Sequence, residues 1–260
     1  MNEPVALPHS PPLVIGATGG SGTRVIARIA RHAGYNLGAH LNGADDSLDF
    51  VSLHDTWINR VITAGSDGAE FPEALKRDFQ AALSKHLSST NAAANERWGW
   101  KAPRSIYLLP FLRAQFPGMR FIHVLRDGRD MALSKNQNQL RKHGRAVLRW
   151  WERWFFRRSI RSILLWHRIN ARAADFGEAQ LGSAYLRIRF EDLCGAPVET
   201  TARILEFLSA SVDPEEIARA EISPPKTLGR WQTQRASHIA AMQARAGESL
   251  RRFGYLDAPR

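Results

Sequence analysis

Residues 13–24 read LVIGATGGSGTR, and this stretch decides the fold. The apolar run at 13–15 predicts a short buried strand, and the glycines after it predict a tight turn. Apolar residues then recur at helical spacing from residue 25 until Gly34 ends the pattern. A turn between a strand and a helix exposes backbone N–H groups at the helix start. These donors and the helix dipole favour a bound phosphate or sulfate.

The rest of the chain repeats the alternation of strands with helices. Further strands are expected at 98–101, 120–125 and 185–190, and helices at 71–87, 105–116, 130–142, 145–174, 197–208 and 237–253. Residues 38–53 are expected to be rich in turns, and residues 84–96 to form a polar loop. Strands that alternate with helices predict an α/β domain with a central parallel sheet flanked by helices.

Length and composition predict one globular domain. The chain has 260 residues, of which 44% are hydrophobic, a size that one core can support. Four prolines within the first twelve residues predict a flexible leader at 1–12, followed by one α/β domain over 13–260. The first residues carry no basic segment followed by an apolar core, and no uninterrupted apolar stretch reaches ~18 residues. We therefore expect a cytoplasmic protein.

The charge balance favours anionic ligands. Lys and Arg number 36 against 25 Asp and Glu, which gives a net charge of +11. The arginines are spread along the expected helices and do not form one basic stripe, so nucleic acid is disfavoured as a partner. Cys194 is the one cysteine, so neither an internal disulfide nor a thiolate zinc site is expected.

The glycine turn alone allows more than one class of protein. A nucleotide-hydrolysing P-loop is disfavoured because no lysine occurs between residues 16 and 31. The glycines at 16, 19 and 22 also fit an NAD(P)-binding Rossmann-type turn of the short-chain dehydrogenase kind. None of the four tyrosines has the lysine four residues later that such enzymes use. This class stays open as an alternative, as does a catalytically inactive nucleotide-binding module.

A second motif, RFIHVLRDGRDMALS at 120–134, carries a family resemblance. It resembles the 3′-phosphate motif of sulfotransferases that use 3′-phosphoadenosine 5′-phosphosulfate (PAPS). In that motif an arginine ends a strand and a serine follows eight residues later, which here are Arg126 and Ser134. A guanidinium recognises phosphate with two parallel hydrogen bonds, and a hydroxyl two turns into the next helix would add a donor.

Four more segments resemble elements of the same family, in the family's order. They are SGTR at 21–24, which resembles the 5′-phosphosulfate loop, KAPR at 101–104, FEDL at 190–193, and KTLGRW at 226–231, which resembles a loop that closes over the nucleotide. The resemblance implies a P-loop-like fold, PAPS as donor, adenosine 3′,5′-bisphosphate as product and no metal. It implies donor binding by Gly20, Ser21, Gly22, Thr23, Arg24, Arg126, Ser134, Gly229, Arg230 and Trp231.

The chain departs from the family at Gly20, where relatives usually carry Lys or Arg. Lys101 is then expected to supply the missing cation, with Arg24 as its rival. The family often places a basic carboxylate about 20 residues after the loop, which corresponds to Asp46 first and Asp45 second. His40 and His54 are weaker candidates for the same role. The acceptor is not specified by the sequence: a carbohydrate, a lipid or a small molecule would each fit.

Residues 145–174 are unusually rich in Trp, Phe and Arg. Aromatic residues from 150 to 166 alternate with arginines at 149, 153, 157, 158 and 161. Spacing of three and four residues is typical of a helix packed on a core. The alternatives are an acceptor-binding wall or a weak contact with a membrane surface, since basic helices with Trp bind lipid interfaces.

Overall fold

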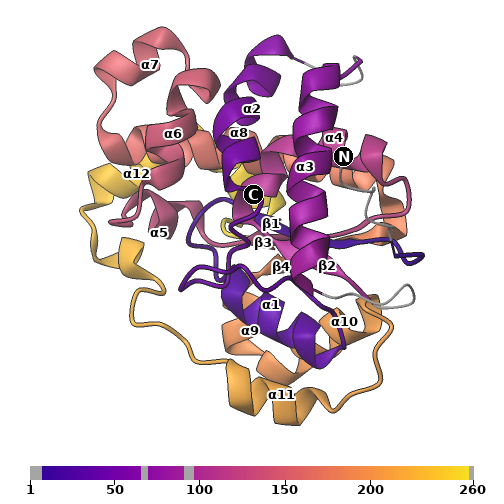
Figure 1. The fold of residues 1–260 in the computed structure, drawn as a ribbon. Coiled ribbons are helices and arrows are strands. Elements are labelled where there is room, and N and C mark those ends of the chain that lie inside the picture. The colour runs from indigo at the N-terminus through magenta and orange to yellow at the C-terminus, as the bar shows by residue number, and fades with distance from the viewer. Residues whose placement is uncertain (1–7, 66–69, 91–96, 258–260) are drawn as a thin grey trace.

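The computed structural model describes residues 8–65, 70–90 and 97–257 (Figure 1). Its centre is a four-stranded sheet in the order β2-β1-β3-β4 in which all neighbouring strands are parallel. The strands are β1 (Leu13–Ala17), β2 (Gly99–Lys101), β3 (Arg120–Leu125) and β4 (Tyr185–Arg189). The α/β fold with a central parallel sheet, predicted from the alternation of strands and helices, is confirmed.

Helices cover both faces of the sheet (Figure 1). One face is covered by α1 (Thr23–His32), α9 (Phe190–Gly195), α10 (Pro197–Phe207) and α11 (Pro214–Glu221). The other is covered by α2 (Val51–Ala64), α3 (Glu73–Thr90), the 3-10 turn η1 (Pro103–Leu108), α4 (Leu109–Gln115) and α8 (Arg158–Gln180). The strands supply both faces because successive side chains alternate: Leu13 and Ile15 pack on the first side and Val14 on the second.

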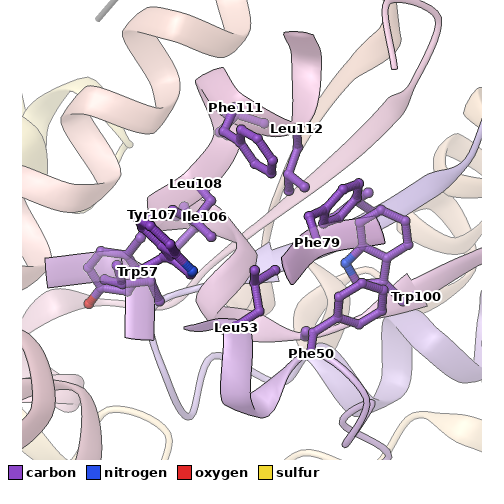
Figure 2. Close-up of a cluster of buried hydrophobic side chains, with 14 of the residues drawn as sticks. Phe50, Leu53, Trp57, Phe79, Trp100, Ile106, Tyr107, Leu108, Phe111 and Leu112 are labelled. Carbon is purple, nitrogen blue, oxygen red and sulfur yellow. The ribbon is translucent and has the colours of Figure 1, made fainter. Parts of the chain in front are cut away.

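Aromatic rings fill the core under α2 and α3 (Figure 2). Phe50 stacks on Trp100 of β2 with ring centroids 4.7 Å apart, and Phe79 meets Phe111 edge-on at 5.3 Å. Ring pairs in such geometries add about 0.5–1.5 kcal/mol each beyond the burial of their area. The side chain of Trp100 therefore anchors the short strand β2. This anchoring fixes the position of Lys101, the next residue.

The remaining helices form a third group beside the sheet. It comprises α5 (Gly128–Ala132), α6 (Asn138–Val147), α7 (Trp150–Phe155) and α12 (Ala236–Arg252), and the short turn η3 (Arg230–Thr233) contacts α5. The short turn η2 (Gly182–Ala184) instead joins α8 to β4. Helix α12 packs against α8. None of the helices in the described ranges combines the length and the apolarity that crossing a bilayer requires.

The helix expected over 130–142 is wrong, because α5 ends at Ala132 and α6 begins at Asn138. Polar side chains between them bind local backbone: Ser134 Oγ accepts from the Asn136 amide, and Gln137 Nε2 donates to the carbonyls of Met131 and Ser134. Such bonds compete with the helical ladder. Ser134 therefore lies after the helix and not two turns inside it.

The long helical region expected over 145–174 is not continuous, since it consists of the end of α6, then α7, then α8. Extended backbone at Leu148 and Arg149 and again at Phe156 and Arg157 makes the two breaks. Glu152 accepts from the Arg149 amide at 2.8 Å and so caps the start of α7.

Two expected loops are shorter than predicted. Helix α3 continues to Thr90 through the polar residues placed in the loop 84–96, of which 91–96 lie outside the described residues. His86 in this last part of α3 is buried and bonds the Gly99 carbonyl at 2.9 Å. The turn-rich segment ends earlier as well, because α2 begins at Val51. Residues 1–7 of the leader expected at 1–12 lie outside the described residues. In its described part, the Ser10 carbonyl accepts a hydrogen bond from the Trp98 indole at 2.8 Å.

Candidate active site

The candidate site lies at the carboxyl edge of the sheet. Strand β1 pairs in parallel with β2 and β3, with Ile15 opposite Lys101 and Ala17 opposite Val124. The segments that follow these strands therefore start side by side. They are the glycine loop (residues 16–23), the segment after Lys101 and the segment after Leu125. Ligands of open α/β sheets gather at such an edge.

The glycine loop has the backbone of an anion-binding turn. Gly20 and Gly22 both have φ of 86°, a left-handed conformation that glycine adopts without steric cost. Among the described residues no side chain caps the start of α1, and no acidic residue occurs in its first turn. The Val25 amide donates to the Gly22 carbonyl at 3.2 Å, so the amides of Thr23 and Arg24 before it are the ones available to an anion, which the helix dipole also favours. The Ser21 hydroxyl is buried and donates to the Thr18 carbonyl at 2.6 Å, so Ser21 offers the site its amide.

Beside the loop lies a cavity of about 430 Å³, which we call the Lys101 cavity. Its wall includes Gly19, Gly20, Gly22 and Thr23 from the loop and its helix. Among the described residues that line it, one is a carboxylate, Asp46, and four carry cationic side chains: Arg24, Lys101, Arg104 and Lys142. The lining charge therefore favours an anionic ligand.

Lys101 ends β2 and points into this cavity with a side chain only 2% exposed. Its Nζ donates to the Asp46 carboxylate and to the Ala44 carbonyl, the latter at 2.7 Å. Burial lowers the pKa of Lys101 below its usual value, and the hydrogen bond to Asp46 opposes that effect. The structure thus brings together the predicted cation and the first predicted carboxylate, which are 55 residues apart in the chain.

Asp45, the second predicted carboxylate, turns the other way. Its φ of 61° directs the side chain to the outer face of α1, where Oδ2 lies 3.6 Å from Arg28 Nε and 3.7 Å from Arg31 Nη1. Asp45 is not among the residues that line the Lys101 cavity. Of the two neighbours, only Asp46 faces the candidate site.

His54 is a second titratable group in the cavity wall. It is buried, and burial followed by the nearby Arg104 cation lowers its pKa to about 3. His54 is therefore a neutral imidazole at neutral pH. His40 lies elsewhere, with Nδ1 3.1 Å from the buried Asp49 carboxylate.

Two cations of the cavity were not predicted as site residues. Arg104 and Lys142 both bind Asp55 on α2, Lys142 through Nζ at 2.6 Å and 2.9 Å. Arg104 belongs to the KAPR segment at 101–104, so its position just after a predicted strand could have indicated a site residue. Lys142 reaches the cavity from α6, and nothing near it in the sequence indicates this.

Arg126 is a buried guanidinium at the end of β3. Its Nη2 donates to the Thr227 carbonyl at 2.8 Å and to the Thr227 hydroxyl at 3.1 Å. Its Nε has no hydrogen-bond partner among the described residues. A buried donor without a partner costs about 1–3 kcal/mol, so this side chain has capacity for an anionic ligand.

The segment 190–193 connects Arg126 to the glycine loop. The guanidinium lies 5.5 Å above the Phe190 ring, and a Cβ at Gly22 would stand 2.2 Å from that ring. Glu191 accepts from the Asp127 amide at 2.9 Å, and burial raises the pKa of Glu191. The packing explains why a bulky side chain at residue 22 is excluded.

Asp130 holds the C-terminal loop (residues 226–231) against the Arg126 segment. Its fully buried carboxylate accepts from the amides of Gly229 at 2.7 Å and Trp231 at 3.0 Å. Arg129 adds a cation–π contact 3.5 Å above the Trp231 ring. Burial and the neighbouring Arg126 cation lower the pKa of Arg230. Arg230 Nε donates to the Thr227 carbonyl at 3.2 Å, the same oxygen that Arg126 binds, so the two guanidiniums meet at this loop.

The structure groups the predicted binding residues into two places. Gly20, Gly22, Thr23 and Arg24 line the Lys101 cavity, whereas Ser21 is not among its lining residues. Arg24 Nη2 donates there to the Gly43 carbonyl at 2.7 Å. Arg126, Gly229, Arg230 and Trp231 form the second place under the C-terminal loop. The Ser134 hydroxyl accepts from the Asn136 amide at 3.2 Å, which leaves its own O–H to donate, so its predicted contact with the 3′-phosphate stays a prediction. Within the described ranges, no three His, Cys, Asp or Glu side chains are grouped as a metal site.

A cationic cavity, a glycine turn and a strand-end arginine at one edge of a parallel sheet define a nucleotide-binding α/β protein of the P-loop-like kind. Comparison with known families makes this specific: the model of the Sulfotransferase family matches residues 19–214. The chain therefore belongs to the sulfotransferase family. No curated protein sequence matches the chain.

Solved structures share the fold at low sequence identity. The sulfotransferase domain of the Synechococcus PCC 7002 olefin synthase has a TM-score of 0.58 at 16% identity and covers 99% of both chains. A sulfotransferase from Alicyclobacillus acidocaldarius has a TM-score of 0.52 at 15% identity, covering 93% of this chain and 96% of the other. One from Mycobacterium avium has a TM-score of 0.53 at 14% identity, covering 97% of this chain and 78% of the other. These similarities place the chain in the sulfotransferase fold.

Replacing Asp130 with Asn should loosen the C-terminal loop. The Asn side chain has one oxygen for the two backbone donors and carries no charge. The loop should therefore lose on the order of 1–3 kcal/mol of stabilisation. We expect hydrogen exchange of the amides of residues 227–233 to accelerate about ten-fold or more. Asp213→Asn is the matched control, since Asp213 accepts from the Glu215 amide at the start of α11. Equal exchange of the loop in both variants would show that Asp130 does not hold it.

Proposed function

We propose that the chain transfers a sulfuryl group from PAPS to a hydroxyl or amine acceptor and releases adenosine 3′,5′-bisphosphate. The observation that carries this proposal is the pair of cationic places at one sheet edge. The Lys101 cavity lies beside a glycine loop, and Arg126 and Arg230 meet at the C-terminal loop. PAPS carries a phosphosulfate at the 5′ position and a phosphate at the 3′ position of its ribose, so a donor that bridges the two places would be neutralised at both.

The donor's 5′ end would be held by the glycine loop. In this proposal the amides of Ser21, Gly22 and Thr23 and the Thr23 hydroxyl bind the phosphosulfate, and Gly20 lets the backbone approach it closely. Arg24 lines the same cavity and adds positive charge. The 3′-phosphate would bind Arg126, whose buried Nε lacks a partner among the described residues, together with Arg230. The Gly229 and Trp231 segment would then cover the nucleotide.

Transfer forms a bond from the acceptor oxygen or nitrogen to sulfur while the bond from sulfur to the bridging oxygen breaks. Negative charge develops on that oxygen, which stays with the nucleotide, and Lys101 would stabilise it. Asp46 would take the acceptor's proton. In the described residues Lys101 donates to Asp46 and Ala44, and an ammonium has three N–H donors. The third is available for the donor's bridging oxygen.

Membership of the sulfotransferase family argues against the dehydrogenase alternative, while a catalytically inactive nucleotide-binding member remains a distinct hypothesis. Calorimetric titration with adenosine 3′,5′-bisphosphate, NADPH and ATP separates these classes. We expect binding of the first and little of the others, because only the sulfotransferase proposal requires a 3′-phosphate site. A donor-hydrolysis or transfer assay then separates an active enzyme from an inactive member. In this proposal residues 13–260 form one domain, and the acceptor is a carbohydrate, a lipid or a small molecule.

Arg126→Ala should weaken the binding of adenosine 3′,5′-bisphosphate by at least ~1.5 kcal/mol, the contribution of a charged hydrogen bond. The binding of adenosine 5′-phosphosulfate, which has no 3′-phosphate, should change little. The matched control is Arg120→Ala at the opposite end of β3, where Arg120 Nη1 donates to the Phe207 carbonyl at 2.7 Å. Dissociation constants from titration calorimetry are the measurement. If both nucleotides lose affinity equally, Arg126 does not recognise the 3′-phosphate.

Lys101→Ala should lower kcat by on the order of 10²-fold or more with a modest change in donor affinity, because the charge acts mainly in the transition state. Arg24→Ala is the matched comparison, since Arg24 lines the same cavity but donates to the Gly43 carbonyl. The assay is turnover of PAPS with an acceptor found by screening. A dead Arg24→Ala beside an unimpaired Lys101→Ala would assign the catalytic cation to Arg24.

Asp46→Asn should abolish most turnover if Asp46 is the base, whereas His54→Gln should retain it. The pKa of His54 is already lowered to about 3, so the imidazole is a poor proton acceptor in this cavity. The measurement is kcat for both variants, with donor affinity as a check that the site persists. Loss of turnover in His54→Gln alone, with donor affinity retained, would assign the base to His54.

A further inference from the structure

Helix α7 exposes three large aromatic rings to solvent. Trp150 is 69% exposed, and Trp154 and Phe155 are each 76% exposed. The other large apolar side chains exposed in the described residues are Leu48, Val198 and Val212, at 40–45%. Figure 1 shows α7 at the periphery of the molecule, beyond α6. Scattered exposed apolar residues are normal, but adjacent exposed rings indicate a binding surface.

The outward direction of these rings is set by a buried ion pair. Glu152 of α7 is 3% exposed and binds Arg168 of α8 through two hydrogen bonds of 2.6 Å and 2.7 Å. Its Oε2 also accepts from the Arg149 amide. Since Glu152 points into the fold, Trp150 and Trp154, one turn apart, and Phe155 lie on the remaining surface of α7. The exposure is thus built into the way α7 is anchored.

The surface around the rings is strongly basic. Residues 135–161 contain nine Lys and Arg and one acidic residue, Glu152, which Arg168 already neutralises. A groove of about 470 Å³ next to α7 is lined by Lys135, Arg141, Arg145, Arg153, Arg158 and Arg161 among others. No carboxylate occurs among the described residues that line it. The groove therefore complements a surface with many negative charges.

We propose that α7 and this basic groove bind the surface of an anionic lipid bilayer. Trp150, Trp154 and Phe155 would enter the boundary between headgroups and acyl chains, where indole rings are preferred. The surrounding arginines would contact lipid phosphates, each adding attraction to the negative surface potential. This binding is a property of the α7 surface and does not depend on the transfer reaction.

The rings favour a bilayer over a soluble polyanion. Arginines alone would bind a polyanion, whereas the hydrophobic rings gain free energy only when they leave water. Phe155 has no polar atom with which to contact a phosphate or a sugar hydroxyl. Gln137, Asn138 and Leu140 line both the groove and the Lys101 cavity, so the docked surface would be continuous with the wall of the candidate site.

The test is co-sedimentation of the full chain with vesicles of phosphatidylcholine, with and without phosphatidylglycerol. We expect binding to the vesicles that contain phosphatidylglycerol. Trp154→Ser with Phe155→Ser should weaken it about ten-fold or more, and so should Arg153→Gln with Arg158→Gln. Val198→Ser with Val212→Ser and Arg77→Gln with Arg219→Gln are matched controls at other exposed positions, and they should bind like the parent. Thermal melts check that all variants fold.

Three results would overturn the proposal. The first is no binding to either vesicle, or binding that the α7 and groove variants leave unchanged. The second is a dimer in analytical ultracentrifugation that the α7 variant abolishes, with no vesicle binding, which would mean that a second copy covers the rings. The third is binding of an RNA oligonucleotide in place of vesicles. None of these assays uses PAPS, so a result against membrane binding does not bear on the proposed transfer reaction. In the same way, an inactive enzyme would not contradict membrane binding.

Discussion

The parallel pairing of β1 with β2 and β3 is the constraint on which the candidate site depends. Parallel strands end at one edge, so the glycine loop, Lys101 and Arg126 become neighbours although more than 100 residues separate the first from the last. The pairing also exposes the first amides of α1 at that edge. A register shift of one residue in β2 would move Lys101 to the other face of the sheet. The stacked rings of Phe50 and Trp100 hold that register.

The charged side chains under the C-terminal loop also lie at this edge of the sheet, in the segment that follows β3. Asp127 pairs with Arg129, and Asp130 is occupied by two backbone amides, so neither carboxylate is given wholly to Arg126. Arg126 lies 3.5 Å from Asp130 and otherwise contacts oxygens of Thr227. Buried guanidiniums cannot lose their proton, so an uncompensated one is costly. Asp130 supplies part of the compensating charge through its ion pair with Arg126, and in the proposed function a phosphate on the donor adds to it.

Local sequence patterns predicted much of this arrangement. Apolar runs located the four strands, and glycines located the turn before α1, because both depend on neighbouring residues. Contacts from distant segments were not predictable in that way. Lys142 enters the Lys101 cavity from α6, and Arg168 neutralises Glu152 sixteen residues earlier. The helix expected over 130–142 failed because Ser134 and Gln137 bind backbone that a helix would use.

Gly20 shows why the proposed cation should come from a neighbouring strand. A residue with a side chain would be strained at a φ of 86°. With this loop backbone, Lys or Arg at position 20 would therefore need a change in the turn itself. Lys101 avoids that conflict because β2 adjoins β1 and ends at the same edge. In the proposed function the glycine loop approaches the phosphosulfate with its backbone alone, while Lys101 supplies the positive charge from the neighbouring strand β2.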